Sequence, residues 1–436
     1  MLLLSASSVL SATLFWPKTS AAQSEDRTNF SLDSELWNKL SLGQSHGFDR
    51  QSTVTEHFDF RSELKYEPED DYKAVLGARV NAFSANGAAE SFDADLELFN
   101  AYAELSGSAY SLKAGNQIVR WGKADEISPL DNINPEDFRD GFVRRRTDRK
   151  LPTPLLNLEL FQETSKLQLL YQPVHVRSKI DLFNSNWAYF GSEAEPTAVN
   201  EDYSRSLGNG SYGTRLSGTI RDFDYGVSFL SAPSSLPSIG SLRPLPNMPA
   251  IDAPSLPELA EYARLTGQEI DLNYNRRQIV GFDFETVWED FGLRGDVAYF
   301  SREDFYTSRL EAVSKPLLRY TLGADYSGTE GTYINLQFAQ AIMTDWDEDI
   351  LFTKRITNTF YTELSQEFYD HNLKGGIRGS YDINLRTYFY NPYLALNFWD
   401  QVAFEFGFDL PGGPQDTLIG TYRNNEQGYL ILKGYF

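Results

Sequence analysis

Apolar and polar residues alternate at every second position along several long segments of this chain. In residues 52–66, Phe58 and Phe60 take even positions, whereas Asp59 and Glu63 take odd ones. The same alternation recurs in residues 280–289, 356–368 and 401–409. A period of two places apolar side chains on one face of a β-strand and polar side chains on the other. The pattern therefore predicts a chain built mainly of amphipathic strands.

These predicted strands are long. Strands of globular proteins usually have about five or six residues, whereas a tilted strand needs about nine to eleven to cross the hydrocarbon layer of a membrane. The segments above match the longer figure. A large soluble β-sandwich is the alternative, but its sheets would still need their edges covered. We therefore predict an all-β fold, a transmembrane antiparallel up-and-down barrel with long extracellular loops and short periplasmic turns.

Eighteen such segments occur, which is an even number as in bacterial barrels. The alternative is sixteen strands, if the first segment or one beside a long loop is not a strand. The predicted spans are residues 35–43, 52–66, 71–84, 93–106, 109–120, 152–163, 165–173, 210–220, 223–231, 276–289, 291–302, 316–326, 330–342, 354–368, 371–382, 386–398, 400–409 and 427–436. The alternation slips between Leu98 and Phe99, which predicts a β-bulge there.

The connections between these strands differ in length on the two sides. If the first strand rises from the periplasm, the long connections all fall on the extracellular side, which is typical of bacterial barrels. These connections are residues 121–151, 174–209, 232–275, 303–315, 343–353 and 410–426. Aromatic residues at the periplasmic strand ends predict a belt at the membrane interface. They are Tyr66, Trp288, Phe291, Tyr326, Phe368 and Trp399.

The two ends of the chain indicate export to the cell outer membrane. Residues 1–22 resemble a signal peptide, because an apolar run precedes the small residues Ser20, Ala21 and Ala22. The basic start of such a signal is absent, which suggests a misplaced or truncated start codon. Residues 23–436 then form a single barrel domain. The terminal Phe436 resembles the signal read by the barrel-assembly machinery, which is therefore an expected partner. Outer-membrane lipid and lipopolysaccharide are expected partners because of the location.

The composition argues against several other classes of protein. No cysteine is present, so disulfides cannot stabilise the fold. After the signal, no apolar run reaches the roughly 18 residues of a transmembrane helix. The net charge of −22 would repel phosphate, so no nucleic-acid partner is expected. None of His46, His57, His175 and His371 lies in a recognisable nucleophile motif, so no enzyme activity and no catalytic residues are expected.

The 232–275 connection has two parts of different character. Seven prolines between Pro233 and Pro257 predict a stiff, largely extended chain. Ser255 and Glu258 then form a predicted capping box for a short amphipathic helix that stops at Gly267. Two positions for this helix remain open: it constricts the pore, or it packs on the barrel rim.

A basic cluster crowds into twelve positions of the 121–151 connection. Its members are Arg139, Arg144, Arg145, Arg146, Arg149 and Lys150. In a lumen the cluster would attract an anionic solute, and at the rim it would hold lipopolysaccharide phosphate. We favour a third interpretation, local pairing, because neighbouring acidic residues nearly balance the charge. These neighbours are Asp125, Glu126, Asp131, Glu136, Asp137, Asp140 and Asp148.

Closely spaced oxygen-bearing residues in the same connection offer ligands that calcium prefers. They are Asp131, Asn132, Asn134, Glu136 and Asp137. The glycine of an EF-hand turn is absent, and Asn and Asp also simply close turns. We therefore expect no cofactor, with calcium as the alternative.

The strand register also predicts a polar, net acidic lumen. Its acidic residues are Asp59, Glu63, Asp93, Asp95, Glu97, Asp283, Glu285, Glu363 and Glu405, together with Asp296, Glu367 and Asp409. Arg61, Lys65, Arg215 and Arg294 lie between them. Such a wall suits a water-filled lumen that favours cations or neutral polar solutes. Alternatively, the charges pair with one another and leave no open path.

Two motifs resemble one known family. The first combines Gly115, Gln117, Arg120-Trp121-Gly122, Pro129-Leu130-Asp131, Ile133-Asn134-Pro135, Asp137 and Arg149-Lys150-Leu151-Pro152; the second is the run from Asp416 through Arg423 to Asn425. Both resemble the hallmarks of a porin-like family of proteobacterial outer-membrane barrels known as a domain of unknown function. The resemblance implies a barrel, described as a porin or as the partner of a hydrophobe exporter, and no established catalytic residues.

The sequence therefore favours an outer-membrane channel, or porin-like transporter, that passes polar or small solutes through a charged lumen constricted by outer loops. The first alternative is an exporter or importer of a hydrophobic molecule that works with an inner-membrane transporter partner. A surface scaffold or adhesin, or a barrel hydrolase, represents a different class.

Overall fold

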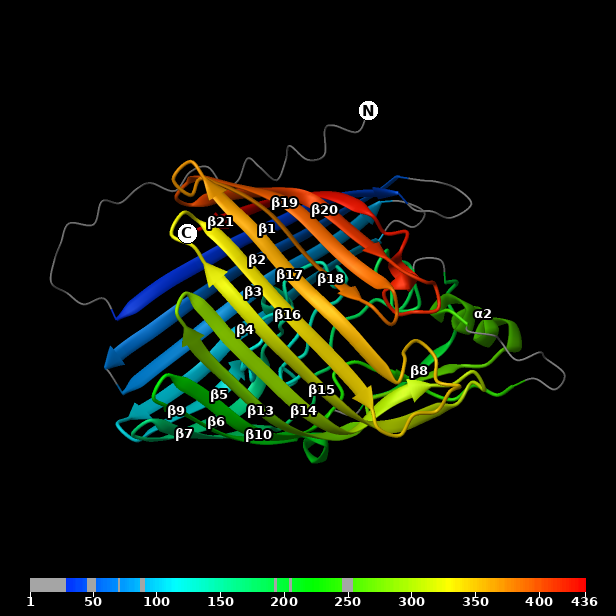
Figure 1. Cartoon of the computed structure of the whole chain (residues 1–436), viewed down its shortest axis with the longest axis horizontal. Helices are drawn as coiled ribbons and strands as arrows, with labels where there is room; N and C mark the ends of the chain where they lie inside the picture. The colour runs from blue at the N-terminus through cyan, green and yellow to red at the C-terminus, as the bar shows by residue number, and fades with distance from the viewer. Residues whose placement is uncertain are drawn as a thin grey trace.

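Eighteen antiparallel strands form one sheet that closes on itself in the computed structural model, which describes residues 29–44, 52–69, 71–86, 91–191, 194–203, 206–244 and 254–436. Closure occurs where the first strand pairs with both the second and the last. Figure 1 shows the strands tilted and wrapped into a barrel. The strands are β1 (Phe30–Gln44), β2 (Ser52–Glu69), β3 (Tyr72–Asn86), β4 (Ser91–Gly107), β5 (Tyr110–Gln117), β6 (Thr153–Gln162), β7 (Ser165–Gln172), β9 (Ser211–Ile220), β10 (Phe223–Pro233), β13 (Arg276–Trp288), β14 (Phe291–Tyr306), β15 (Ala312–Ser327), β16 (Thr332–Met343), β17 (Ile356–Phe368), β18 (Leu373–Asp382), β19 (Thr387–Trp399), β20 (Val402–Gly412) and β21 (Gln427–Tyr435).

The predicted eighteen-stranded barrel is confirmed, and some strand ends differ. The fifth strand was expected to reach residue 120 but ends at Gln117. There the Asn134 side-chain amide donates a hydrogen bond to the Gln117 carbonyl oxygen at 2.8 Å, and the chain turns inward. The expected loop 303–315 is shorter, because β14 and β15 resume their ladder beyond an irregularity between Phe300 and Glu303. The signal-peptide prediction for residues 1–22 lies outside the described residues.

The predicted β-bulge is present beside the position expected from the slipped alternation. Leu76 of β3 pairs with Ala101 of β4, but Ala78 pairs with Leu98, so two residues of β4 oppose Gly77 alone. A Cβ atom on Gly77 would lie 2.6 Å from the Asn100 carbonyl oxygen, so the glycine permits this close approach. The bulge shifts the register of β4 by one residue, so that apolar and polar side chains keep alternating between the two faces of the sheet after the slip.

The outer surface of the barrel is apolar. Leucine, valine and phenylalanine side chains of the outward register are exposed, as Leu96 at 78% illustrates. Such a continuous apolar surface is unfavourable in water and suits the hydrocarbon layer. Large aromatic residues are exposed at the strand ends near the short turns, among them Trp288 and Trp399.

The extracellular end carries a small subdomain built from the long loops. It contains a three-stranded sheet of β8 (Val199–Asp202), β11 (Ser238–Ile239) and β12 (Ile270–Asn273), and the helix α2 (Leu256–Thr266). The predicted capping box is present, with Ser255 and Glu258 bonded reciprocally and Gly267 left-handed at the end. Leu259, Ala260 and Ala263 are fully buried in the subdomain core.

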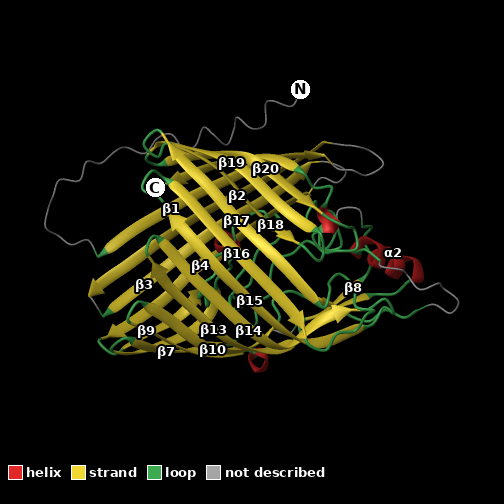
Figure 2. Cartoon of the chain, in the orientation of Figure 1, coloured by secondary structure: helices red, strands yellow, loops and turns green. Residues whose placement is uncertain are grey.

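The helix α2 lies at the barrel mouth, beyond the strand ends (Figure 2). The sequence left open whether this helix constricts the pore or packs on the barrel rim, and the structure places it at the rim. No helix in the described ranges combines the length and the apolar character required to cross a bilayer.

Candidate functional site: a loop folded into the lumen

The connection between β5 and β6, residues 118–152, folds into the barrel; it is called the lumen loop below. Its first half packs on apolar wall residues, because Trp121, Leu130 and Ile133 share a buried cluster with wall residues such as Phe300. Trp121 also donates its indole N–H to Gln168 at 2.8 Å. A Cβ atom on Gly281 of β13 would lie 2.1 Å from Leu130, so glycine makes room for the loop. The loop is thus a packed part of the barrel interior.

Asn134 joins the two ends of the lumen loop. Its amide donates to the carbonyl oxygens of Gln117 and Leu151 at 2.8 and 2.9 Å, and its side-chain oxygen accepts the Val119 N–H at 2.8 Å. Asn134 is buried, so losing these bonds would leave several polar groups unsatisfied. Gln117 and Asn134, which belong to the motif noted in the sequence, are therefore structural neighbours.

The acidic and basic residues of the lumen loop pair closely with one another. Glu136 lies 2.9 Å from Arg149, 3.0 Å from Arg146 and 3.2 Å from Lys150. Burial alone would raise the pKa of Glu136, but these three cations more than offset it and lower the pKa to about 2. Asp131 lies 3.0 Å from Lys150. This half of the basic cluster shows the local pairing favoured from the sequence.

The other half of the basic cluster pairs with the barrel wall, which the sequence did not predict. Arg145 forms an ion pair with Glu363, and Arg144 approaches Asp59. Arg139 lies 2.7 Å from Asp93 of the wall and also 2.9 Å from Asp137 of the loop, which is a local pair. Of the acidic neighbours expected to balance the cluster, Asp140 binds Lys39 of β1 at 3.3 Å, and Asp125 binds Arg294 of β14 at 2.9 Å. Charges of the loop and charges of the wall therefore compensate each other across the lumen.

Each of the nine predicted acidic lumen residues contacts a polar or charged partner. Besides Asp59, Asp93 and Glu363, Asp95 and Glu97 both bind Lys179, at 2.9 and 3.0 Å. Glu63 accepts a bond from Asn100, Asp283 from Arg215 and Glu285 from Lys123. Glu405 lies 3.4 Å from Lys433. The acidic wall is thus paired with donors from the lumen loop, from Lys179 of the 173–210 connection and from neighbouring strands.

The predicted calcium ligands face cations of the protein. The carboxylates of Asp131 and Glu136 contact Arg146 and Lys150, and Asp137 accepts a bond from Arg139 at 3.1 Å. Among the described residues, no group of three or more acidic, histidine or cysteine side chains is placed to hold a metal ion.

The histidines are dispersed. His57 of β2 contacts the Asn81 amide at 2.8 Å, and His371, in a periplasmic turn, forms an ion pair with Glu367. His175, in the 173–210 connection, has its pKa lowered to about 4 by burial and by Arg276. His46 lies outside the described residues.

The lumen loop separates cavities on its two sides. On the extracellular side, a cavity of about 560 Å³ is lined by Arg146, Arg149 and residues of β15 and β16. On the periplasmic side, a cavity of about 230 Å³ is lined by Arg144, Arg145 and Asp148, together with residues of β1 and β18–β21. The short helix α1 (Arg146–Arg149) contributes lining residues to both cavities, Arg146 and Arg149 to the first and Asp148 to the second.

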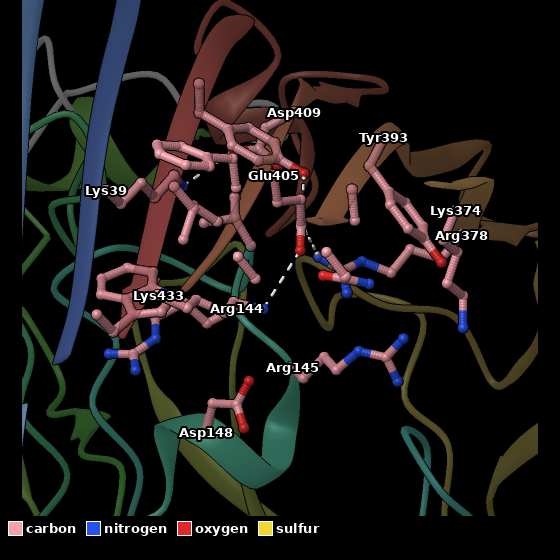
Figure 3. Close-up of a pocket in the computed structure, with 18 of the residues that line it drawn as sticks. Lys39, Arg144, Arg145, Asp148, Lys374, Arg378, Tyr393, Glu405, Asp409 and Lys433 are labelled. Atoms are coloured by element: carbon pink, nitrogen blue, oxygen red, sulfur yellow. Dashed lines mark hydrogen bonds and ion pairs between the residues drawn. The ribbon is translucent and has the colours of Figure 1, made fainter. Parts of the chain in front are cut away.

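The smaller periplasmic cavity is rich in basic side chains (Figure 3). Its charged lining residues are Lys39, Arg144, Arg145, Lys374, Arg378 and Lys433 against Asp148, Glu405 and Asp409. Lys39, Lys374, Arg378 and Lys433 belong to no motif or charge cluster in the sequence. The alternation of β1, β18 and β21 could have indicated their inward direction, but only the folded barrel brings them to one cavity.

The closed barrel, its apolar outer surface and its polar, loop-filled lumen define a porin-like outer-membrane β-barrel. The chain belongs to the family described as protein of unknown function (DUF1302), whose family model matches residues 28–349. This match confirms the resemblance seen in the sequence and includes the motif at residues 115–152. No curated protein matches the sequence.

Solved structures share the fold. Pseudomonas aeruginosa OccK7 (OpdD) superimposes with a TM-score of 0.50 at 10% identity, covering 94% of this chain and 99% of that one. Acinetobacter baumannii OccAB4 gives a TM-score of 0.50 at 11% identity, with the same coverage of 94% and 99%. At such low identity the likeness concerns the fold alone.

Proposed function

We propose that this protein is an outer-membrane channel through which small polar solutes pass the lumen loop. The observation that supports the proposal most directly is the pair of cavities to which α1 contributes lining residues, both lined by charged side chains. A charged, hydrated lumen lowers the cost of moving a polar solute across the hydrocarbon layer. The ion pairs of the loop with the wall, such as that of Arg145 with Glu363, then hold the constriction in place.

Single-channel recording in planar bilayers tests this proposal. Purified, refolded protein should produce discrete conductance steps, and protein unfolded by heat in detergent should produce none. Replacing Arg145 and Glu363 by glutamine should change the step size, because both lie at the constriction. A folded wild-type barrel that inserts and stays silent at all voltages would contradict the proposal.

A second candidate is transport of a hydrophobic molecule with an inner-membrane partner. A cavity of about 490 Å³ at the mouth supports it, because many of its lining residues are apolar. Among them are Leu236, Ile239, Phe305, Leu418 and Ile419. Apolar cavities bind apolar ligands by excluding water. Calorimetric titration with dodecanol should show binding that Leu236→Asn weakens, and no binding would count against this candidate.

A further inference from the structure

Two ion pairs at the periplasmic cavity have a cation that is more exposed than its carboxylate partner. The Arg145 side chain is 38% exposed, whereas that of its partner Glu363 is 4% exposed. Lys433 is 31% exposed, and its partner Glu405 is 12% exposed. A solute in this cavity therefore meets the Arg145 guanidinium and the Lys433 ammonium groups, which are more exposed than the carboxylates that pair with them.

Arg378 of β18 lacks a full partner. Within the described part of the chain it makes no hydrogen bond, and its nearest carboxylate oxygen, on Glu405, is 3.9 Å away. Glu405 is already engaged by Lys433 and by the Tyr429 hydroxyl. The Arg378 guanidinium is also placed over the Tyr393 ring, 5.5 Å from its centre. The Arg378 guanidinium therefore has N–H donors without a hydrogen-bond partner, and its planar fork suits an oxyanion.

Arg144 gives an independent indication of excess positive charge. Its buried Nε atom has no hydrogen-bond partner, and its terminal nitrogens reach Asp59 only at 3.4 and 3.5 Å. The same carboxylate already accepts bonds from Arg61 and Arg79 at 2.7–3.1 Å. Three guanidinium groups thus share Asp59, and the Arg144 side chain lines the cavity.

A second periplasmic cavity, of about 550 Å³, has the same excess. Its basic lining residues are Lys113, Arg120, Lys123, Lys166 and Arg215, and its acidic ones are Glu159 and Asp224. In each periplasmic cavity the basic lining residues outnumber the acidic ones by three. This distribution is opposite to the net charge of −22 of the whole chain.

We propose that the cavity between Arg145, Arg378 and Lys433 is a binding site for a small oxyanion, a carboxylate or a phosphate, and that it makes the channel select anions. The selectivity rests on the proposed channel function, whereas the binding site does not. The arrangement reverses the preference for cations or neutral solutes expected from the acidic wall. The reason is that, at this cavity, the carboxylates of Glu363 and Glu405 are less exposed than the cations of Arg145 and Lys433 that pair with them.

Binding is tested on the folded protein in detergent micelles at low ionic strength. Calorimetric titrations with acetate and with inorganic phosphate should show binding of at least one, and the comparison identifies the preferred oxyanion. Arg378→Gln should weaken binding about ten-fold, because a hydrogen bond between charged groups contributes at that order. Arg378→Lys should weaken it less. Arg264→Gln, which removes a charge on α2 outside the cavity, should leave it unchanged.

Glu405→Gln gives a test in the opposite direction, because it removes the carboxylate that competes for Arg378 and Lys433. This variant should bind the oxyanion more tightly, which a misfolded protein would not do. In bilayers under a salt gradient, the wild-type reversal potential should indicate anion preference, Arg378→Gln should shift it toward cations and Glu405→Gln toward anions.

The outcomes separate the two proposals. Conductance without binding of acetate or phosphate, or identical binding by wild type and Arg378→Gln, would overturn the oxyanion site and leave the channel standing. Binding without conductance would overturn the channel and leave the site.

Discussion

Asp296 of β14 accepts the backbone N–H of Lys123 at 2.8 Å, and thereby fixes the entry of the lumen loop to the barrel wall. The same carboxylate accepts the Ala124 N–H at 3.1 Å and the Ser128 hydroxyl at 2.6 Å. Asp296 itself is fully buried. One wall residue therefore satisfies three donors of a loop that is distant in sequence, and the position of the constriction depends on it.

Asp296→Ala should loosen the lumen loop. Each buried donor left without a partner costs about 1–3 kcal/mol, so the loop should leave its packed position part of the time. We expect larger and noisier conductance steps than in wild type. Asp33→Ala is the control, because Asp33 is another acidic residue of the barrel wall and pairs with Lys65 of β2 instead of the lumen loop. Equal step sizes in all three proteins would contradict the anchoring role.

Gly122→Ala should resemble Asp296→Ala. Gly122 has a φ of +92°, and an added Cβ atom would lie 2.6 Å from Asp296 and 2.2 Å from the Ser128 hydroxyl oxygen. The substitution therefore strains the backbone and also displaces the Asp296 carboxylate that holds the loop. Gly375→Ala is the matched control, because its Cβ atom would meet only Leu394, at 3.6 Å. Wild-type conductance in Gly122→Ala would show that the loop tolerates the change.

Arg145→Gln and Glu363→Gln should have similar effects that do not add. Each single substitution breaks the same ion pair between the lumen loop and β17, so the double variant has no further contact to lose. We expect the conductance of the double variant to match the more affected single variant. If the two changes instead sum, the residues act independently.

Acid should weaken the packing of the lumen loop between about pH 4.5 and pH 2. The pKa of Glu136 is near 4.5 in an unstructured chain and about 2 in the folded loop. Its stabilising contribution is therefore complete above pH 4.5 and is lost as the pH falls toward 2. Conductance recorded across this range should change, and Glu136→Gln should reduce the change. An identical pH profile for wild type and variant would assign the transition to other groups.

Ser255→Ala should destabilise α2 by about 1 kcal/mol, because it removes an N-cap with a complete capping box. Hydrogen exchange of the amides in α2 should become faster, while exchange in the barrel strands stays unchanged. Ser241→Ala, also in the mouth subdomain but outside the helix, is the control. Protection equal to wild type would mean that packing alone holds the helix.

Local patterns in the sequence determined the barrel and its helix. Alternation over lengths that cross a membrane marked the strands, since every crossing strand needs one face for lipid and one for the lumen. The slip beside Leu98 marked the bulge, and Ser255, Glu258 and Gly267 marked α2, because a bulge and a helix cap involve residues close in sequence. Each of these features could be predicted from neighbouring residues alone.

Only the tertiary structure decided where the lumen loop lies and which charges meet there. Arg145 and Glu363 are 218 positions apart, and Lys39 and Asp409 are 370 apart. Barrel closure brings such residues together, and no periodicity encodes their pairing. The sequence showed an acidic wall and a basic loop. Folding pairs the charges of the loop with those of the wall, and it gathers more basic than acidic side chains around the periplasmic cavities.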